Sequence, residues 1–212
     1  MRYRRETLSQ RGGTASGERF RELRAFLSQL DAVLEDGEQP AERVHTVKQR
    51  LADLIGRSPE LPAEVRATSG DHYARHLLYA DPGDRYEIVV MAWSPGQATP
   101  IHDHSGIWCV EGVVEGRIDV TRYDLKEMVS EGVARMQATE VIRAGLGQCG
   151  ALIPPVEYHK IANPYDQPAF TIHVYGGRMR TCRVFERRAD DTYQVRLQPL
   201  GFNSPDAALS AL

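Results

Sequence analysis

The sequence has few cysteines, no long apolar run and no large excess of either charge. Only three of its 212 residues are cysteines, an odd and small number that argues against a disulfide framework and favours a reducing compartment. No stretch approaches the roughly 20 apolar residues of a membrane helix, and the basic start lacks the apolar run of a secretory signal. The net charge of −3 gives no reason to expect a polyanionic partner. We expect a cytoplasmic monomer with no nucleic-acid or membrane partner.

The composition is that of an ordinary globular domain, with 42% hydrophobic and 26% charged residues. Residues 1–17 are rich in arginine, glycine, serine and threonine, and we expect them to be disordered. Apolar residues then recur at three- and four-residue steps, which predicts two amphipathic helices within about 18–65. We expect residues 18–212 to form a single domain.

Beyond about Gly70 the pattern changes to short β-rich runs separated by glycine and proline turns. Examples are "YEIVVMAW" at 86–93 and "AFTIHVYGG" at 169–177. No helical pattern separates these runs, which favours antiparallel strands over a parallel sheet with crossover helices. The predicted fold class is mainly β, with a β-barrel at about 85–200 covered by an N-terminal helical layer.

The stretch "PIHDHSGIWCVEG" concentrates residues that bind metals or react. His102 and His104 share one face if this stretch is extended, and His159 is a third imidazole. Three neutral nitrogens without a carboxylate suit iron, zinc or copper. The alternative for the His-x-His pair is a polar strand edge with no function. A nucleophilic Cys109–histidine pair is rejected, because both histidines lie on one strand face beside a third ligand.

The spacing of these residues resembles the two motifs of the cupin superfamily, whose fold is a jelly-roll β-barrel. Residues that match the first motif are Gly96, His102, His104, Cys109 and Gly116, and those that match the second are Pro154, His159 and Asn163. Cys109 stands where the first motif usually has a glutamate. The resemblance therefore implies a metal site of three histidines without a carboxylate ligand.

A more specific resemblance, from about Tyr73 to Phe185, is to the cysteine dioxygenases among the thiol dioxygenases. "HDHSGIWC" places Cys109 where the mammalian-type enzymes have the cysteine of a Cys–Tyr thioether crosslink. "TIHVYGG" places Tyr175 at the crosslinked tyrosine and His173 at the histidine that orients it. The resemblance thus implies catalytic roles for these three residues. One departure is that Gly176-Gly177 follows Tyr175 where mammalian members have Ser-Pro.

The same resemblance implies how a substrate would bind. "YARHLL" places Tyr73 and Arg75 where the family binds the substrate carboxylate, and Trp93 also falls into register with a site residue. Arginine offers a planar, two-point donor for a carboxylate. Relatives with glutamine at this position favour 3-mercaptopropionate, so Arg75 tilts the prediction toward L-cysteine.

The function that the resemblance implies is an Fe(II)-dependent oxidation of L-cysteine by O2 to cysteine sulfinate, with His102, His104 and His159 as iron ligands. Two alternatives stay open. The substrate can be another small thiol carboxylate, such as 3-mercaptopropionate or mercaptosuccinate. The chain can also be a non-catalytic cupin module that binds a metal or a small acid, although such a module has no need of Tyr175 and His173.

Overall fold

The computed structural model describes residues 20–35, 40–155, 158–204 and 208–209, so the predicted disordered segment 1–17 lies outside it. Two α-helices and a 3-10 turn precede the strands: α2 (Arg21–Glu35), α3 (Pro40–Gly56) and η1 (Ala63–Arg66). The strands are β1 (Ala74–Ala80), β2 (Glu87–Trp93), β3 (Ile101–His102), β4 (Cys109–Glu115), β5 (Arg117–Ser130), β6 (Val133–Gly145), β7 (Cys149–Leu152), β8 (Tyr158–Ala162), β9 (Ala169–Tyr175), β10 (Thr181–Arg187) and β11 (Tyr193–Pro199). Among the described residues, no helix is both long and apolar enough to cross a bilayer.

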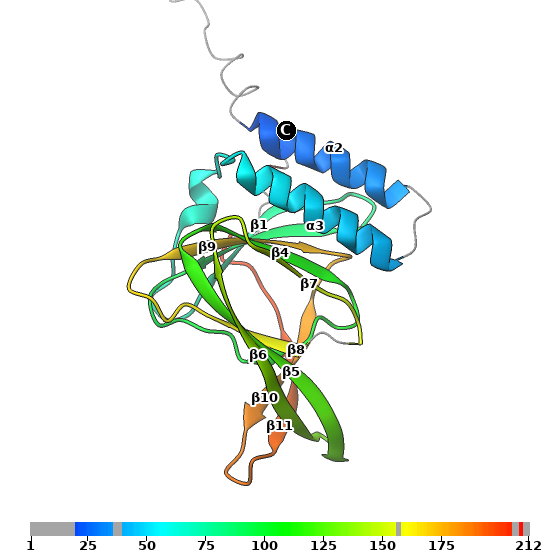
Figure 1. The fold of residues 1–212 in the computed structure, drawn as a ribbon, viewed down its shortest axis with the longest axis vertical. Coiled ribbons are helices and arrows are strands. Elements are labelled where there is room, and N and C mark those ends of the chain that lie inside the picture. Colours follow the sequence, from blue (N-terminus) through cyan, green and yellow to red (C-terminus); the bar gives the residue numbers. More distant parts are fainter. Residues whose placement is uncertain (1–19, 36–39, 156–157, 205–207, 210–212) are drawn as a thin grey trace, which may run out of the picture.

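The strands form two sheets with a helical layer on one side. One sheet has the order β1-β2-β9-β4-β7, and the other strands close on themselves in the order β10-β11-β6-β5-β8-β3. All of these strand pairs are antiparallel. Helices α2 and α3 lie side by side over the first sheet, and β10 and β11 lie at the far end of the molecule (Figure 1). This arrangement confirms the predicted fold class, a mainly β cupin-type barrel with a helical layer.

The first sheet is apolar on both faces because each face covers a different core. Strands β2 and β9 are buried at every position. Ile88 and Val174 pack on the same side as the helical residues Leu51 and Leu30, whereas alternate residues such as Met91 face the barrel interior. Since strand side chains alternate between faces, this pattern decides which polar residues of β4 and β9 point inward.

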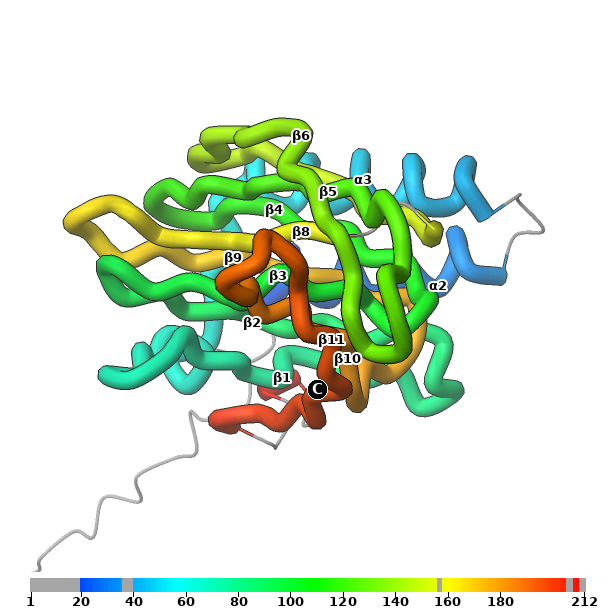
Figure 2. Tube along the Cα trace, turned by 90° about the horizontal axis from the view of Figure 1, so that it is seen from below, coloured from blue at the N-terminus to red at the C-terminus, as the bar shows by residue number. Residues whose placement is uncertain are grey.

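The first strand lies between the predicted start of the β-rich region, about Gly70, and the predicted start of the barrel. The expected start of the barrel at about residue 85 misses β1, which carries Arg75 and His76. The C-terminal segment pairs with this strand: Arg75 N–H donates to Asn203 Oδ1 at 2.9 Å, and Asn203 N–H donates to the Arg75 carbonyl at 2.7 Å. Figure 2 shows the red C-terminal segment beside β1. This contact covers the edge of the sheet and fixes the backbone from which Arg75 projects.

Candidate metal centre and active site

Asp103 anchors the segment that carries the first two histidines. His102 ends β3 and pairs across the strands with His159 of β8. Asp103 is fully buried, and its carboxylate accepts hydrogen bonds from the backbone N–H of Arg183 at 2.8 Å and from its Nε at 2.5 Å. These charge-assisted bonds hold the backbone between His102 and His104, so both rings can turn toward His159.

The three predicted metal ligands meet in one cluster. Their ligand nitrogens lie within 4.8 Å of one another, and the Nε2 atoms of His102 and His159 are 3.2 Å apart. His104 and His159 are buried. Burial lowers the pKa of all three imidazoles, that of His102 to about 4, because the charged form loses its hydration. The neutral rings offer lone pairs at neutral pH, as metal ligands must.

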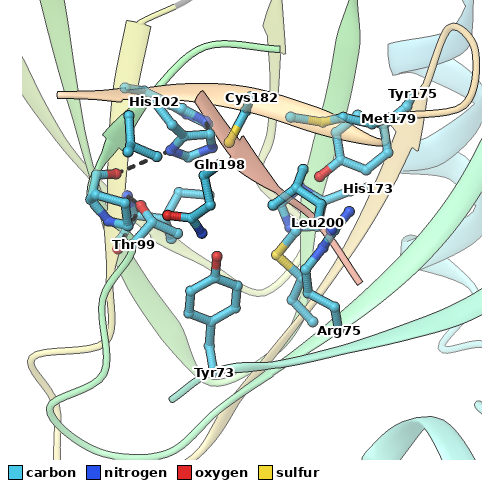
Figure 3. A pocket seen from close by; sticks show the side chains of 15 residues that line it. Tyr73, Arg75, Thr99, His102, His173, Tyr175, Met179, Cys182, Gln198 and Leu200 are labelled. Atoms are coloured by element: carbon cyan, nitrogen blue, oxygen red, sulfur yellow. Dashed lines mark hydrogen bonds between the residues drawn. The ribbon is translucent and has the colours of Figure 1, made fainter. Parts of the chain in front are cut away.

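Arg75 reaches the same cavity from β1 (Figure 3). Its side chain is buried, and only Nη1 has a hydrogen-bond partner, the Gly201 carbonyl at 3.4 Å. Its Nε and Nη2 atoms are buried without one, and no ion pair involves Arg75 in the part of the chain that the structure describes. Buried N–H groups without an acceptor are costly, and the buried Glu87 carboxyl interacts with Arg75 only electrostatically, so this cavity favours an anionic ligand that accepts hydrogen bonds from Arg75.

The cavity adjoins a wider one that opens toward the surface. The inner cavity, of about 20 Å³, is lined by the rings of His102 and His159 together with Tyr73 and Arg75. The outer cavity, of about 320 Å³, is also lined by Tyr73 and Arg75, and by residues of the segment from Gln198 to Asn203. A small molecule that enters from outside therefore meets Tyr73 and Arg75 before it meets the histidines.

Strand β9 presents Tyr175 and His173 on its barrel face. Tyr175 lines the inner cavity, and its ring centroid is 5.9 Å from that of His104. The rings of His173 and Tyr175 lie nearly parallel with centroids 6.0 Å apart. His173 forms its hydrogen bond with Thr171 rather than with Tyr175: its Nε2 lies 2.8 Å from Thr171 Oγ1. The role of His173 in orienting Tyr175 stays a prediction.

Trp93 lies behind the cavity and supports Tyr73. It is fully buried, its ring stacks on Tyr73 with centroids 4.8 Å apart, and its Nε1 donates to Thr171 Oγ1 at 3.0 Å. It does not belong to the residues that line the cavity in the described part of the chain. The role of Trp93 at the substrate site stays a prediction, and in the structure its contact with the cavity runs through Tyr73.

Cys109 lies directly opposite Tyr175 in the register of β4 and β9. Both side chains belong to the same buried cluster. Burial and the nearby Glu111 raise the pKa of the Cys109 thiol well above its usual range, so the group is protonated at neutral pH. A buried, protonated thiol is a poor nucleophile, in agreement with the rejection of a Cys–His hydrolase.

Comparison with known proteins identifies the family. The family model for cysteine dioxygenase type I matches residues 62–188, more than half of the chain and all of the predicted site residues. The chain belongs to this family.

Individual members are distant relatives. Cysteine dioxygenase type 1 of Danio rerio is 22% identical over 126 residues, which cover 59% of this chain and 61% of that protein. The Homo sapiens protein of the same name is 23% identical over 144 residues, 66% of this chain and 70% of its own length. Thus the match spans less than two thirds of the Danio rerio protein.

Solved structures with a similar barrel match less closely. The protein TT1209 from Thermus thermophilus is 20% identical with a TM-score of 0.41, and the match covers 56% of this chain and 97% of that one. Oxalate oxidase in complex with glycolate is 15% identical with a TM-score of 0.41, and the match covers 55% of this chain and 59% of that one. At these scores the likeness adds nothing to the description of the site.

The departure of this chain from mammalian cysteine dioxygenases at Gly176-Gly177 has a steric cause. Gly176 N–H donates to the Trp108 carbonyl at 2.9 Å, next to Cys109. A Cβ atom on Gly176 would lie 2.2 Å from atoms of the Trp108 ring, well inside any real contact. Glycine is therefore required where the backbone leaving Tyr175 meets this tryptophan.

Glu111 is the site residue that the sequence analysis missed. It is two positions beyond Cys109 on β4, shares its face and is 4% exposed. Its Oε1 lies 3.7 Å from His159 Nδ1, and its Oε2 lies 3.4 Å from His173 Nδ1. Burial raises the pKa of Glu111 to about 7. A single charged residue inside the apolar run "CVEGVV" was the available signal.

Proposed function

We propose that this chain is an iron-dependent thiol dioxygenase that adds both atoms of O2 to the sulfur of L-cysteine. The observation that carries this proposal is the buried guanidinium of Arg75, which has two nitrogens without a hydrogen-bond acceptor and shares a cavity with His102 and His159 of the cluster. The histidines suit a divalent metal and Arg75 suits a carboxylate. A small thiol that carries a carboxylate can engage both.

The residues fit iron as the resident metal. Three neutral imidazoles leave the double charge of Fe(II) uncompensated, which favours an anionic thiolate at the site. Bound iron supplies the redox chemistry without which ground-state dioxygen reacts poorly with a closed-shell thiolate. Zinc would bind the same histidines but has no redox chemistry. His102, His104 and His159 would hold the ion.

The chain's own side chains would bind and orient the reactants. Arg75 would hold the substrate carboxylate, with the Tyr73 hydroxyl beside it. Tyr175 would donate a hydrogen bond from its phenol, whose pKa is raised well above its usual range by burial and which therefore keeps its proton. The balanced reaction is thiolate plus O2 giving sulfinate. The sulfur loses four electrons, the two oxygen atoms gain them, and both S–O bonds form at the same sulfur.

Oxygen uptake tests this function directly. Iron-loaded protein should consume one O2 for each L-cysteine and release cysteine sulfinate, and it should turn over L-cysteine faster than 3-mercaptopropionate, mercaptosuccinate or cysteamine. The zinc-loaded protein is the matched control and should consume none. Faster turnover of another thiol carboxylate would favour the alternative substrate. Absence of uptake with every thiol would favour the non-catalytic binding module.

We further propose that Cys109 and Tyr175 form a thioether bond. The Cys109 S–H and one ring C–H of Tyr175 would be lost, an S–C bond would form, and dioxygen would take up the two electrons and two protons. The bond would hold the phenol in place before substrate binds, which lowers the cost of reorganisation.

After turnover with L-cysteine and O2, a fraction of the chains should have lost two hydrogen atoms in intact mass. Cys109→Gly should show no such loss and should retain part of the activity, because an unlinked Tyr175 can reach the same position. Cys149→Ser, at a half-buried thiol outside this strand pair, should behave like the wild type. A persistent free thiol at Cys109 after turnover would contradict the crosslink.

A further inference from the structure

Glu111 connects the candidate metal centre to the hydrogen-bond chain behind it. Its two carboxylate oxygens face the Nδ1 atoms of two different histidines, His159 and His173. Glu111 Oε2 and His159 Nδ1 are both buried without a hydrogen-bond partner. Hydrogen bonds at catalytic sites are often long until ligands bind, and distances of 3.4 and 3.7 Å fit this situation.

A series of hydrogen bonds links Trp93, Thr171 and His173. The indole N–H of Trp93 can only donate, and it donates to Thr171 Oγ1. The Thr171 hydroxyl keeps its own hydrogen and can donate it to His173 Nε2, 2.8 Å away. With Nε2 as the acceptor, the neutral His173 ring carries its hydrogen on Nδ1, the atom that faces Glu111. In this arrangement the series of hydrogen bonds that starts at Trp93 ends at the Glu111 carboxylate.

His159 approaches the same carboxylate from the other side. Its Nε2 lies 3.2 Å from His102 Nε2, inside the histidine cluster, so the neutral ring that keeps this nitrogen free for a metal carries its hydrogen on Nδ1. That N–H faces Glu111 Oε1. Histidine ligands commonly donate their second N–H to a carboxylate, which orients the ring and makes it a stronger donor.

We propose that Glu111 is a positioning residue that fixes the tautomer of the metal ligand His159 through Oε1 and that of His173 through Oε2. This inference rests on the proposed function, because it takes the histidine cluster as the metal site. It differs from the resemblance to cupins, where the glutamate of the first motif occupies the position of Cys109. Glu111 lies two residues further along the strand and contacts the ligand from behind.

A second cavity lies on the Glu111 side of His159. It has a volume of about 200 Å³, and Glu111 and His159 both line it. Arg122 and Gln148, which are exposed, also line it, so the cavity reaches the surface. A small carboxylate such as formate can therefore approach the position of Glu111 from solvent once the side chain is shortened.

Cobalt(II) binding tests the inference without relying on turnover, since the visible absorption of cobalt reports its ligands. Glu111→Gln keeps the shape of the side chain but replaces one of the two acceptor oxygens with an NH2 donor. It should weaken cobalt binding about 10- to 100-fold and shift the absorption bands. Glu115→Gln, at the exposed carboxylate on the same strand, should match the wild type. Wild-type affinity and bands in Glu111→Gln would overturn the inference.

Chemical rescue separates a positioning role from a packing role. Formate should restore cobalt affinity to Glu111→Ala in a concentration-dependent manner, whereas formamide should not. Formate should leave the wild type and Glu115→Gln unchanged. An equal effect of the two additives, or no effect of either, would assign the loss to packing and overturn the inference. Retention of cobalt by His159→Ala would instead reject the metal site itself, and with it the proposed function.

Discussion

Replacing His159 with alanine should reduce bound iron from one ion per chain to background. His159 is fully buried, and its ring nitrogen closes the cluster with His102 and His104. Loss of a group that merely supports a ligand costs about 10- to 100-fold in metal affinity. Loss of one ligand among three should cost more, since only the His-x-His pair would remain. Elemental analysis after dialysis of the iron-loaded protein measures the effect.

The control for this experiment is a histidine outside the cluster. His45 lies on α3, is exposed and contacts Gln49, so His45→Ala should keep one iron per chain. Thermal unfolding of both metal-free variants checks that each is folded. Full iron occupancy in a folded His159→Ala protein would contradict the assignment of the three ligands.

Replacing Arg75 with methionine should lower kcat/KM for L-cysteine about 10- to 100-fold. Methionine is also long and unbranched but removes every donor. A charge-assisted, two-point bond to a carboxylate contributes roughly 1.5–3 kcal/mol, which corresponds to that factor. Cysteamine has the same thiol and amine but no carboxylate, so its turnover should change little. Steady-state oxygen uptake with the two substrates gives the ratio.

Arg66→Met is the matched control for Arg75→Met. Both guanidinium groups lie over an aromatic ring, Arg75 over Phe202 with 5.2 Å to the centroid and Arg66 over Phe170 with 4.5 Å, but Arg66 does not line the inner or outer cavity. Its replacement should leave both substrates unaffected. Equal losses for L-cysteine and cysteamine in Arg75→Met would mean that the arginine supports the structure of the site rather than recognising a carboxylate.

The site residues that could be predicted are those that belong to a short, recognisable sequence motif. The His-x-His pair follows from strand alternation, the second cupin motif indicated His159, and the resemblance to cysteine dioxygenases indicated Arg75 and Tyr175. The fold brings all five of these residues together around the inner cavity. These residues lie close together because strands from distant parts of the sequence pair with one another. The spacing of residues along the sequence does not show which strands pair.

The rest of the site depends on tertiary contacts. Whether Glu111 points inward is decided by which face of β4 covers the barrel, and Gly112 next to it lies under α3, where an added Cβ would meet Ile55 at 2.5 Å. The early start of β1 was missed because "ARHLLYA" contains two charged or polar residues. These residues are strand residues because β1 pairs with β2 along its length, and Asn203 and Ser204 of the C-terminal segment bond to them at the other edge.

The contact between Trp108 and Gly176 constrains how this chain and its relatives can exchange sequence. The indole occupies the volume that any side chain at 176 would need, so position 176 cannot gain a side chain unless the Trp108 ring moves or is replaced by a smaller one. A loop transplanted from a relative with Ser-Pro after the tyrosine would need a smaller residue at 108 in the same step. We therefore expect the residues at positions 108 and 176 to covary among members of the family. The members in which both differ from this chain should mark the branch on which the two substitutions occurred.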